Sequence, residues 1–418
     1  RLLDSGSDGI IVVDCGSKDS EIINSVTRRG IGIAVYDHHL SEDMADDTVS
    51  WLVNPHITGD QHSKTLCATG VLWVWAYQNR IISEDWLRRR LDLVALATLA
   101  DCMPLELLNR SMVIEGIECI RKKPRPGLKA LIDMLGLSLE TLNEEQLVMK
   151  VIPCLNAPGR MDIADITVNL LAGSHNSRLN ADRIISFNKK RQETSRTTVD
   201  ELMQKKDNER AHVFYDPQWH VGVLSGVASN LCNYSNKPIA LAAPVKKGIR
   251  GTLRVPEGAN AVKILNEISD FLSEWGGHEY AAGFAVENDR WEALQSVLEA
   301  KLSSVHIEPP RIRAMAFPPQ KMDMAVYNQI SRLSPFGNGN PRPLFYHDWN
   351  GSEEIRPLGK DGVHRKISIN GNEILAFHSG EFFSSRTRVE GLIYYPRLDT
   401  WRGNTRLQLI LEAFVIEK

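Results

Sequence analysis

Acidic and histidine residues stand where apolar segments of this sequence end. Asp14 follows one apolar run and precedes Cys15-Gly16, and the triplet Asp37-His38-His39 follows a second run. Asp101 stands among apolar residues, where an unpaired charge would be expensive. Carboxylates combined with imidazoles suit a borderline divalent cation such as Mn²⁺, which can polarise a phosphoryl oxygen and acidify water. The residue types therefore predict a metal-assisted hydrolytic site.

Each of these features also has a simpler interpretation when it is taken alone. Asp14 and Asp101 could each cap a helix, and the Asp37-His38-His39 triplet could form a solvated turn. Their meaning depends on whether the fold brings them together.

The surrounding pattern predicts elements that would place these residues at one edge of a sheet. Residues 10–13 and 31–36 are short β-rich runs separated by a helix-compatible stretch, which is the βαβ pattern of a parallel sheet. Ligands gather at the carboxyl ends of such strands. A helical run over residues 86–99 would then deliver Asp101 at its end.

The rest of the chain predicts further folding units. Helices are expected over residues 107–171, with interruptions at 123–127 and 156–160, and a long polar helix without Gly or Pro over about 181–208. A second α/β unit is expected over 211–304, with strands near 212–215 and 238–242. Beyond Pro309-Pro310 and the turn-rich residues 334–341, short alternating strands predict a small β-barrel.

Composition sets limits on the kind of protein and of partner. The 418 residues predict two or three domains. The 49 Lys and Arg against 52 Asp and Glu give a net charge of −3, so a nucleic-acid partner cannot be inferred from net charge and any basic surface must be local. The six cysteines contain no CxxC pair, which argues against a zinc site or a disulfide framework and fits a reducing cytoplasm. No apolar run reaches the roughly 18 residues of a membrane span. We expect a soluble, cytoplasmic protein without a membrane partner.

Taken together, the motifs resemble those of a known family. Asp14, Asp37-His38-His39 and Asp101 within Ala-Asp-Cys-Met-Pro resemble three motifs of the DHH phosphoesterase superfamily, and Gly276-Gly277-His278 resembles the motif of its associated DHHA1 domain. The RecJ branch is indicated by three more segments, which are residues 155–160, 334–343 and 401–409. The resemblance covers essentially the whole chain.

This resemblance implies an α/β fold class and a division into four parts. A parallel-sheet DHH domain would span residues 1–180 and a connecting helix residues 181–208. A smaller α/β DHHA1 domain would span residues 209–304, and a barrel resembling an OB fold, which would bind nucleic acid, residues 305–418.

The resemblance also implies roles for the clustered acids and histidines. Asp14 would bridge two metal ions, and His38 and Asp101 would be ligands of one of them. His39 would face the scissile phosphate, and Asp37 would hold the imidazoles in place. The family's first motif, which supplies further ligands, is absent and is expected upstream of Arg1, so the activity of this chain alone is left open.

A second set of residues matches the substrate-binding positions of the family. Arg160 would bind a terminal 5′-phosphate, and Thr252 and Arg254 match a Ser-x-Arg pair that contacts DNA, with Thr in place of Ser. His278 would approach the phosphate beside the backbone amides of Gly276 and Gly277. The simpler alternatives are a structural ion pair for Arg160 and a buried, hydrogen-bonded ring for His278.

The function implied is a 5′-to-3′ exonuclease specific for single-stranded DNA, dependent on Mn²⁺ or Mg²⁺ in a two-metal site and acting in DNA repair and recombination. The implied partners are single-stranded DNA, a single-strand-binding protein and a helicase, with a monomeric enzyme. Candidates for base stacking in the barrel, each of which could equally be core, are Trp349, Tyr394, Tyr395 and Trp401. The alternatives are a phosphodiesterase for short oligonucleotides or cyclic dinucleotides, a non-catalytic replication scaffold and an inorganic pyrophosphatase.

Overall fold

The computed structural model describes residues 6–40, 51–58, 61–161, 163–173, 176–204, 212–307, 311–349, 353–359, 362–377, 379, 388–401 and 404–416. The predictions made for residues 205–208, for Pro309 and Pro310, and for Arg402 and Gly403 lie outside this description. The chain forms two compact units. The first contains Arg1–Lys123, Leu139–Val148 and Ile312–Lys418, and the second contains Pro124–Ser138 and Met149–Arg311.

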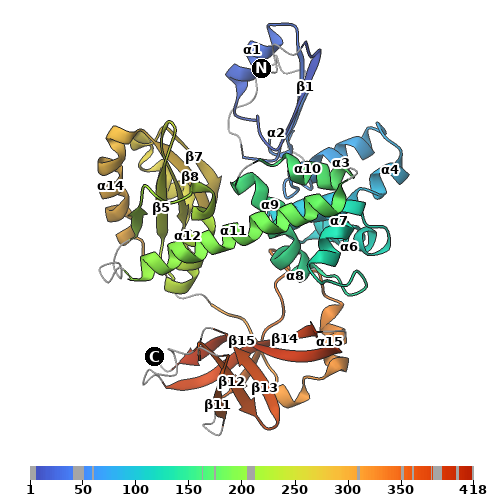
Figure 1. Ribbon diagram of the computed structural model, residues 1–418, viewed down its shortest axis with the longest axis vertical. Coiled ribbons are helices and arrows are strands. Elements are labelled where there is room, and N and C mark those ends of the chain that lie inside the picture. Colours follow the sequence, from blue (N-terminus) through green and yellow to red (C-terminus); the bar gives the residue numbers. More distant parts are fainter. Residues whose placement is uncertain are drawn as a thin grey trace. The chain divides into compact units, whose positions relative to one another are not determined.

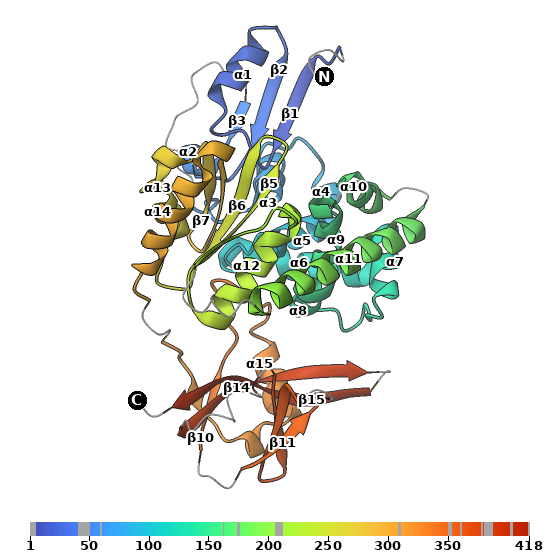
Figure 2. The same ribbon diagram turned by 60° about the vertical axis from the view of Figure 1, so that its left-hand side comes forward.

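A parallel sheet opens the first unit, in blue in Figures 1 and 2. Its strands are β1 (Gly9–Val13), β2 (Gly32–Tyr36) and β3 (Trp51–Val53), in that order, and α1 (Ser20–Thr27) connects the first two. Val13 pairs with Tyr36, and Tyr36 with Val53, so the three strands end level with one another. The predicted βαβ unit is confirmed, and the residue after each strand lies at the same edge.

Helices complete this part of the first unit. They are α2 (Pro55–Thr58), α3 (Ala68–Gln78), α4 (Glu84–Arg88), α5 (Leu91–Ala100) and α6 (Leu107–Lys122). The prediction of a single helix over residues 86–99 is wrong, because Arg90 adopts ψ 7° and separates α4 from α5. This turn allows both Leu87 and Leu91 to be buried. A Cβ on Gly116 of α6 would lie 2.3 Å from the Leu91 carbonyl oxygen, so glycine permits close packing of α5 against α6.

The C-terminal part of the first unit is a mixed seven-stranded sheet. Its strands are β9 (Met315–Ala316), β10 (Phe345–Asp348), β11 (Glu354–Leu358), β12 (His364–Ile369), β13 (Asn372–Ala376), β14 (Val389–Trp401) and β15 (Asn404–Ile416). Their order in the sheet is β11-β12-β13-β15-β14-β10-β9. Alternate apolar residues, among them Ile367, Ile374 and Leu392, form its core beside α15 (Met324–Ser331). Three short helical turns, α8 (Glu144–Gln146), the π-helical η1 (Leu147–Val151) and η5 (Pro319–Lys321), lie elsewhere along the chain.

Four helices open the second unit, namely α7 (Pro126–Met134), α9 (Ile152–Met161), α10 (Asp165–Ala172) and the 28-residue α11 (Ser177–Gln204). The interruption predicted at residues 123–127 is present, because α7 begins at Pro126. The interruption predicted at residues 156–160 is wrong, since this segment lies inside α9 with Pro158 in the helix. Burial of Ala157 and Pro158 offsets the hydrogen bond that proline cannot make.

A five-stranded sheet forms the rest of the second unit. Its order is β4-β5-β6-β8-β7, with the bounds β4 (Val213–Tyr215), β5 (Ile239–Val245), β6 (Gly248–Arg254), β7 (Glu274–His278) and β8 (Ala281–Val286). In this sheet β4 and β5 pair in parallel, and the other described pairs are antiparallel. The helical elements of this part are α12 (Val221–Ser235), α13 (Ala261–Asn266), η3 (Ser269–Phe271), η4 (Asn288–Arg290) and α14 (Trp291–Ser303).

Within this sheet, β5 is buried on both faces. On β5, Ala240 and Ala242 belong to the core with α13 and α14, whereas Leu241 belongs to the core with α12. Figure 1 shows α14 and α12 on opposite sides of the sheet. Burial on both faces explains why β5 is a continuous apolar run instead of an alternating one.

Candidate metal centre and anion site

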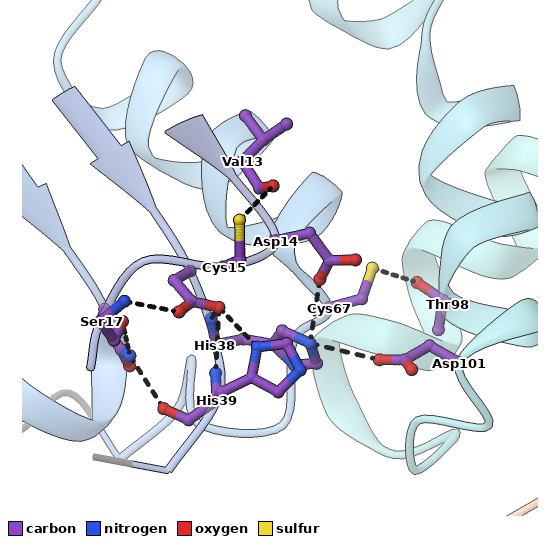
Figure 3. Close-up of polar contacts among 11 residues, drawn as sticks. Val13, Asp14, Cys15, Ser17, His38, His39, Cys67, Thr98 and Asp101 are labelled. Atoms are coloured by element: carbon purple, nitrogen blue, oxygen red, sulfur yellow. Dashed lines mark hydrogen bonds and ion pairs between the residues drawn. The ribbon is translucent and has the colours of Figure 1, made fainter. Parts of the chain in front are cut away.

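Two carboxylates from different elements converge on one imidazole nitrogen. The Nε2 atom of His38, just after β2, lies 3.3 Å from Asp14 Oδ1 and 3.4 Å from Asp101 Oδ2. Figure 3 shows the two carboxylates directed at this ring. The His38 side chain is 3% exposed, whereas those of Asp14 and Asp101 are 67% and 37% exposed. The cluster is therefore open to solvent on its carboxylate side.

The backbone at both carboxylates is unusual. Asp14 adopts φ 64° directly after β1, with its amide donating to the Tyr36 carbonyl at 2.9 Å, and Cys102 adopts φ 53° directly after Asp101. Left-handed conformations are uncommon outside glycine and concentrate at functional sites. Each carboxylate is thus carried on a sharp turn at the end of a regular element.

Asp37 is a buried hydrogen-bond acceptor that holds this edge in place. Its Oδ1 accepts from the His38 amide at 2.8 Å and lies 2.7 Å from His39 Nδ1, and its Oδ2 accepts from the Ser17 amide at 3.1 Å. Burial alone would raise the pKa of Asp37, but these hydrogen bonds hold it well below its usual value. Of the two imidazoles, it is therefore the ring of His39 that the Asp37 carboxylate contacts.

His39 has its two ring nitrogens in different surroundings. The Nδ1 atom contacts Asp37, and this hydrogen bond raises the pKa of the imidazole despite partial burial. The side chain remains 40% exposed. Because the carboxylate fixes the ring at Nδ1, the Nε2 atom is the one that can serve a ligand.

Asn54 and Ser17 are two supporting residues that the sequence analysis missed. Asn54 is fully buried after β3, and its Nδ2 donates to the Ser17 hydroxyl at 2.8 Å and to the His39 carbonyl at 2.9 Å. Asn54 therefore occupies, on the third strand, the position that Asp14 and Asp37 occupy on the first two. Asn54 also follows an apolar run, as Asp14 and Asp37 do, but β3 has only three residues and gives a weak strand pattern in the sequence.

The donor set fits a divalent cation. Ligand atoms of Asp14, His38 and His39 all lie within 4.8 Å of one another. Neighbouring ligands of an octahedral cation with bonds of about 2.1 Å are about 3.0 Å apart, which is close to the 3.3 and 3.4 Å separations around His38 Nε2. Carboxylates combined with imidazole suit Mn²⁺ or Mg²⁺ better than a softer metal.

An arginine cluster, which we define as Arg160, Arg191 and Arg254, lies within the second unit. Arg160 Nη1 donates to the Ser225 hydroxyl at 2.7 Å, and Arg254 Nε donates to the Ser229 hydroxyl at 3.0 Å. Both serines belong to α12, one turn apart. On the same helix, a Cβ added to Gly226 would lie 3.9 Å from Arg191 Nη1. Small residues of α12 thus leave room for three guanidinium groups.

No carboxylate forms an ion pair with this cluster among the residues that the structure describes. Asn188 Oδ1 accepts from Nε and Nη2 of Arg191, and the Thr252 hydroxyl accepts from Arg254 Nη1 at 3.0 Å. Burial, and then the positive charge of Arg160, lower the pKa of both Arg191 and Arg254. Three cations held together by neutral partners form a site with the chemistry to bind an anion. Arg191 was missed because a polar helix face carries many such residues.

Thr252 and the glycine-rich hairpin occupy different surroundings. Thr252 is buried, and its hydroxyl lies 3.4 Å from the Ala282 carbonyl as well as accepting from Arg254.

Gly276, Gly277 and His278 lie on β7 and are exposed. Gly277 has φ 150°, and a Cβ there would lie 2.3 Å from the Ala281 carbonyl oxygen, so the hairpin with β8 requires glycine at this position.

The aromatic candidates of the barrel divide into three groups. Tyr394 is fully buried and its hydroxyl donates to the Phe317 carbonyl, so its prediction as a stacking platform is wrong and it is a core residue. Trp349 packs against the same core. The Tyr395 ring already lies 4.5 Å from the Arg342 guanidinium. The side chain of Trp401 lies outside the described residues.

Comparisons with known proteins show what this chain is similar to. The family model for the RecJ OB domain matches residues 314–413, and that for the DHHA1 domain matches residues 189–304. The single-stranded-DNA-specific exonuclease RecJ of Thermus thermophilus is 29% identical over 95% of this chain. The chain is a homologue of RecJ. The RecJ proteins of Bacillus subtilis and Escherichia coli are 29% and 26% identical, over 98% and 97% of the chain.

Solved RecJ structures agree with the fold. The crystal structure of T. thermophilus RecJ in complex with Mn²⁺ matches all of this chain with a TM-score of 0.82 at 25% identity, and the complex with Mg²⁺ matches 97% with a TM-score of 0.77 at 26% identity. These matches, with the two domain families, confirm the predicted α/β fold class with DHHA1 and barrel domains.

The chain is shorter than the RecJ proteins it matches. It spans 58% of the T. thermophilus protein and 54% of the B. subtilis protein, and 77% of that of E. coli. In the part of the chain that the structure describes, no helix has the length and apolar character required to cross a membrane.

Proposed function

We propose that this chain provides catalytic and DNA-binding parts of a divalent-metal-dependent exonuclease, which hydrolyses single-stranded DNA to mononucleotides from the 5′ end. The observation that carries the proposal is the convergence of Asp14 and Asp101 on His38 Nε2, within 3.4 Å on both sides. Homology to RecJ over nearly the whole chain supports the choice of substrate.

The acidic cluster is the proposed metal site. Asp14, His38 and Asp101 would hold a cation, and Asp14 would also serve as a ligand of a second one. When bound, a divalent cation supplies positive charge to a phosphoryl oxygen and lowers the pKa of water. The RecJ structures with Mn²⁺ and Mg²⁺ support these two ions as candidates.

Residues beside the metal ligands have separate proposed roles. Asp37, which stays ionised because its pKa is held low, keeps the His39 ring oriented through Nδ1. His39 Nε2 would then contact a phosphate oxygen. On β7, His278 would approach the phosphate with the amides of Gly276 and Gly277.

The arginine cluster is the proposed site for the terminal 5′-phosphate. A phosphate monoester carries more charge than an internal diester, so three guanidinium groups that have no carboxylate partner among the described residues favour it. In the described structure Thr252 holds Arg254 through its hydroxyl, so we propose that it acts on DNA through Arg254. Arg160 would provide the direct contact, with Nε and Nη2 available beside its bond to Ser225.

Alternatives from other classes make different predictions. A phosphodiesterase for short oligonucleotides or cyclic dinucleotides does not require the RecJ OB domain that this chain carries at residues 314–413. A non-catalytic scaffold does not require two carboxylates around an imidazole. An inorganic pyrophosphatase requires neither the OB domain nor the arginine cluster.

A length series separates these possibilities. The intact protein containing this chain is incubated with 3′-labelled single strands, from dinucleotides to long oligonucleotides, and with matched duplexes, in Mn²⁺, Mg²⁺ or EDTA. We expect metal-dependent release of mononucleotides from long single strands and little cleavage of blunt duplexes. A preference for dinucleotides, or activity on pyrophosphate alone, would contradict the proposal.

The remaining parts of the proposal concern organisation and cellular context. We propose a DHH domain over residues 1–180, a connecting helix over 181–208, a DHHA1 domain over 209–304 and an OB-like domain over 305–418. The six cysteines, all free, accord with a reducing cytoplasm. A monomeric enzyme working with a single-strand-binding protein and a helicase in DNA repair and recombination completes this proposal.

A further inference from the structure

The turn between α15 and β10 reaches the segment that follows Asp101. Asn338 in this turn donates from Nδ2 to the Cys102 carbonyl at 3.1 Å, and its own carbonyl accepts from the Leu105 amide at 2.6 Å. These contacts lie within one compact unit. Asn338 alone therefore forms hydrogen bonds with both ends of the segment Cys102–Leu105.

This segment determines how Asp101 is presented. Asp101 ends α5, and Cys102 adopts φ 53°, which turns the chain away from the helix. From the other side, Asn109 Nδ2 donates to the Pro104 carbonyl at 3.0 Å, and Asn109 is only 1% exposed. The segment is thus held between one buried asparagine and Asn338. A left-handed residue stays in place only where surrounding contacts fix it.

The approach of the turn depends on glycine. A Cβ on Gly337 would lie 2.8 Å from Leu105 Cδ1, and Gly339 has φ 74° with its Cβ position 3.0 Å from the Glu106 side chain. Glycines on both sides of Asn338 therefore allow its backbone to contact the segment directly.

The turn itself is anchored independently of Asn338. The buried Glu144 carboxylate accepts from the Ser334 hydroxyl at 2.9 Å and from the Phe336 amide at 3.0 Å. Arg110 donates to the Ser334 and Pro335 carbonyls. These hydrogen bonds fix the position of the turn, and so they keep Asn338 beside Cys102.

We propose that Asn338 is a positioning residue for Asp101, and that it raises the affinity of the acidic cluster for a divalent cation by holding the segment Cys102–Leu105. The inference rests on the proposed role of Asp101 as a metal ligand. It assigns to the turn before the barrel a part in metal binding, in addition to linking the barrel to the rest of the unit.

Mn²⁺ binding to the intact protein, followed by electron paramagnetic resonance without DNA, tests this inference. Loss of a group that orients a metal ligand weakens binding by roughly 10–100-fold. For Asn338→Ala, which keeps the backbone contact to Leu105, we expect about a tenfold higher Kd, at the lower end of that range. Asn338→Gln retains a donor and should recover most of the affinity.

Arg342→Ala is the matched control, because Arg342 contacts Glu145 and Tyr395 but not residues 102–105. It should lower the melting temperature without raising the Kd for Mn²⁺. Equal increases in Kd for Asn338→Ala and Arg342→Ala, or an unchanged Kd in a folded Asn338→Ala protein, would overturn the inference.

A second variant keeps the test decisive if Asn338→Ala does not fold. Asn338→Leu is similar in size to the native side chain but cannot donate to the Cys102 carbonyl. A raised Kd for Mn²⁺ in this protein would support the inference, and an unchanged Kd would overturn it. Absence of Mn²⁺ binding in the unaltered protein would instead contradict the proposed metal site itself.

Discussion

The acidic cluster around His38 and the arginine cluster around α12 each hold like charges close together, and these charges have opposite signs in the two clusters. In the first, the carboxylates of Asp14 and Asp101 both lie within 3.4 Å of one imidazole nitrogen. In the second, Arg160 and its two neighbouring arginines are held by hydroxyl and amide groups. Each cluster collects charges of one sign and leaves their neutralisation to a ligand. One suits a divalent cation and the other suits a phosphate.

The two clusters differ in how the chain holds them. The acidic cluster depends on level strand ends and on left-handed turns at Asp14 and Cys102. The arginine cluster depends on small polar side chains, because Ser225 and Ser229 contact the guanidinium groups along one helix. Substitutions in the first should therefore affect the chemical step, and substitutions in the second should affect which DNA end is accepted.

Asp101→Ala in the intact protein should give the largest effect. It removes one of the two carboxylates beside His38 Nε2, and we expect cleavage to fall at least about 10³-fold, which corresponds to about 4 kcal/mol in the activation barrier. Binding of single-stranded DNA should change little, since the barrel and the arginine cluster remain. Cleavage is measured in Mn²⁺ and binding by fluorescence anisotropy in EDTA. Near-normal turnover in Mn²⁺ would show that Asp101 is not a metal ligand.

The acidic cluster was largely predictable because its signals are local. Asp14 and Asp37 each follow a β-rich run, and parallel strands with level ends bring such residues to one edge. Asn54 has the same relation to β3, but three residues carry too weak a strand pattern to identify it. The contact of Glu144 with Ser334 spans 190 residues. No local pattern predicts a partner at that separation.

Arg160→Ala should have the next largest effect, on the choice of DNA end. A hydrogen bond to a charged group contributes about 1.5–3 kcal/mol, so the preference for 5′-phosphate over 5′-hydroxyl ends should fall by roughly 10–150-fold. Slow cleavage should remain, because the acidic cluster is intact. Matched single strands with either end are degraded by both proteins. An unaltered preference in Arg160→Ala would mean that the 5′ end is recognised by other residues.

The arginine cluster was only partly predictable. Arg160 was expected in a loop, because Pro158 and Gly159 usually interrupt helices, yet the structure places it inside α9. Arg191 lies on a helix whose many charged residues look alike in sequence. Its importance becomes visible only through Asn188 and through its closeness to Arg160, which lowers its pKa in addition to burial.

Asp37→Asn should reduce stability in a way that depends on pH. The folded-state pKa of Asp37 is lowered, so its stabilisation is complete above its unfolded value of about 4 and is lost as pH falls. The folded-state pKa of His39 is raised, so its contribution is complete below about 6.5 and is lost as pH rises through the raised value. The loss in free energy of unfolding that Asp37→Asn causes, about 2 kcal/mol, should therefore be largest between about pH 4 and 6.5.

Denaturant unfolding of both proteins in EDTA, across this pH range, measures the difference in free energy of unfolding. Asn54→Asp serves as a comparison, because Asn54 supports the same edge through its donors to Ser17 and the His39 carbonyl. If the loss in free energy of unfolding for Asp37→Asn stays constant from acid to neutral pH, the ionised Asp37–His39 pair is not its cause.

Gly222→Ala is the smallest change and tests how α12 positions Arg160. A Cβ on Gly222 would lie 1.9 Å from the Arg160 carbonyl oxygen, so α9 and α12 must move apart. We expect a loss of about 1–3 kcal/mol in stability, the range for overpacking. Because Arg160 also bonds to Ser225 on α12, the shift should lower the 5′-phosphate preference by less than Arg160→Ala does.

Gly226→Ala on the same helix is the matched control. Its Cβ would meet only Arg191 Nη1, at 3.9 Å, which is ordinary contact, and alanine in a helix interior is favoured over glycine by about 1 kcal/mol. This protein should therefore be as stable as the unaltered one or more stable, with the 5′-phosphate preference retained. If both substitutions lower stability and end preference alike, α12 tolerates no added methyl group anywhere. The specific contact between Gly222 and the Arg160 backbone would then not be what places the guanidinium.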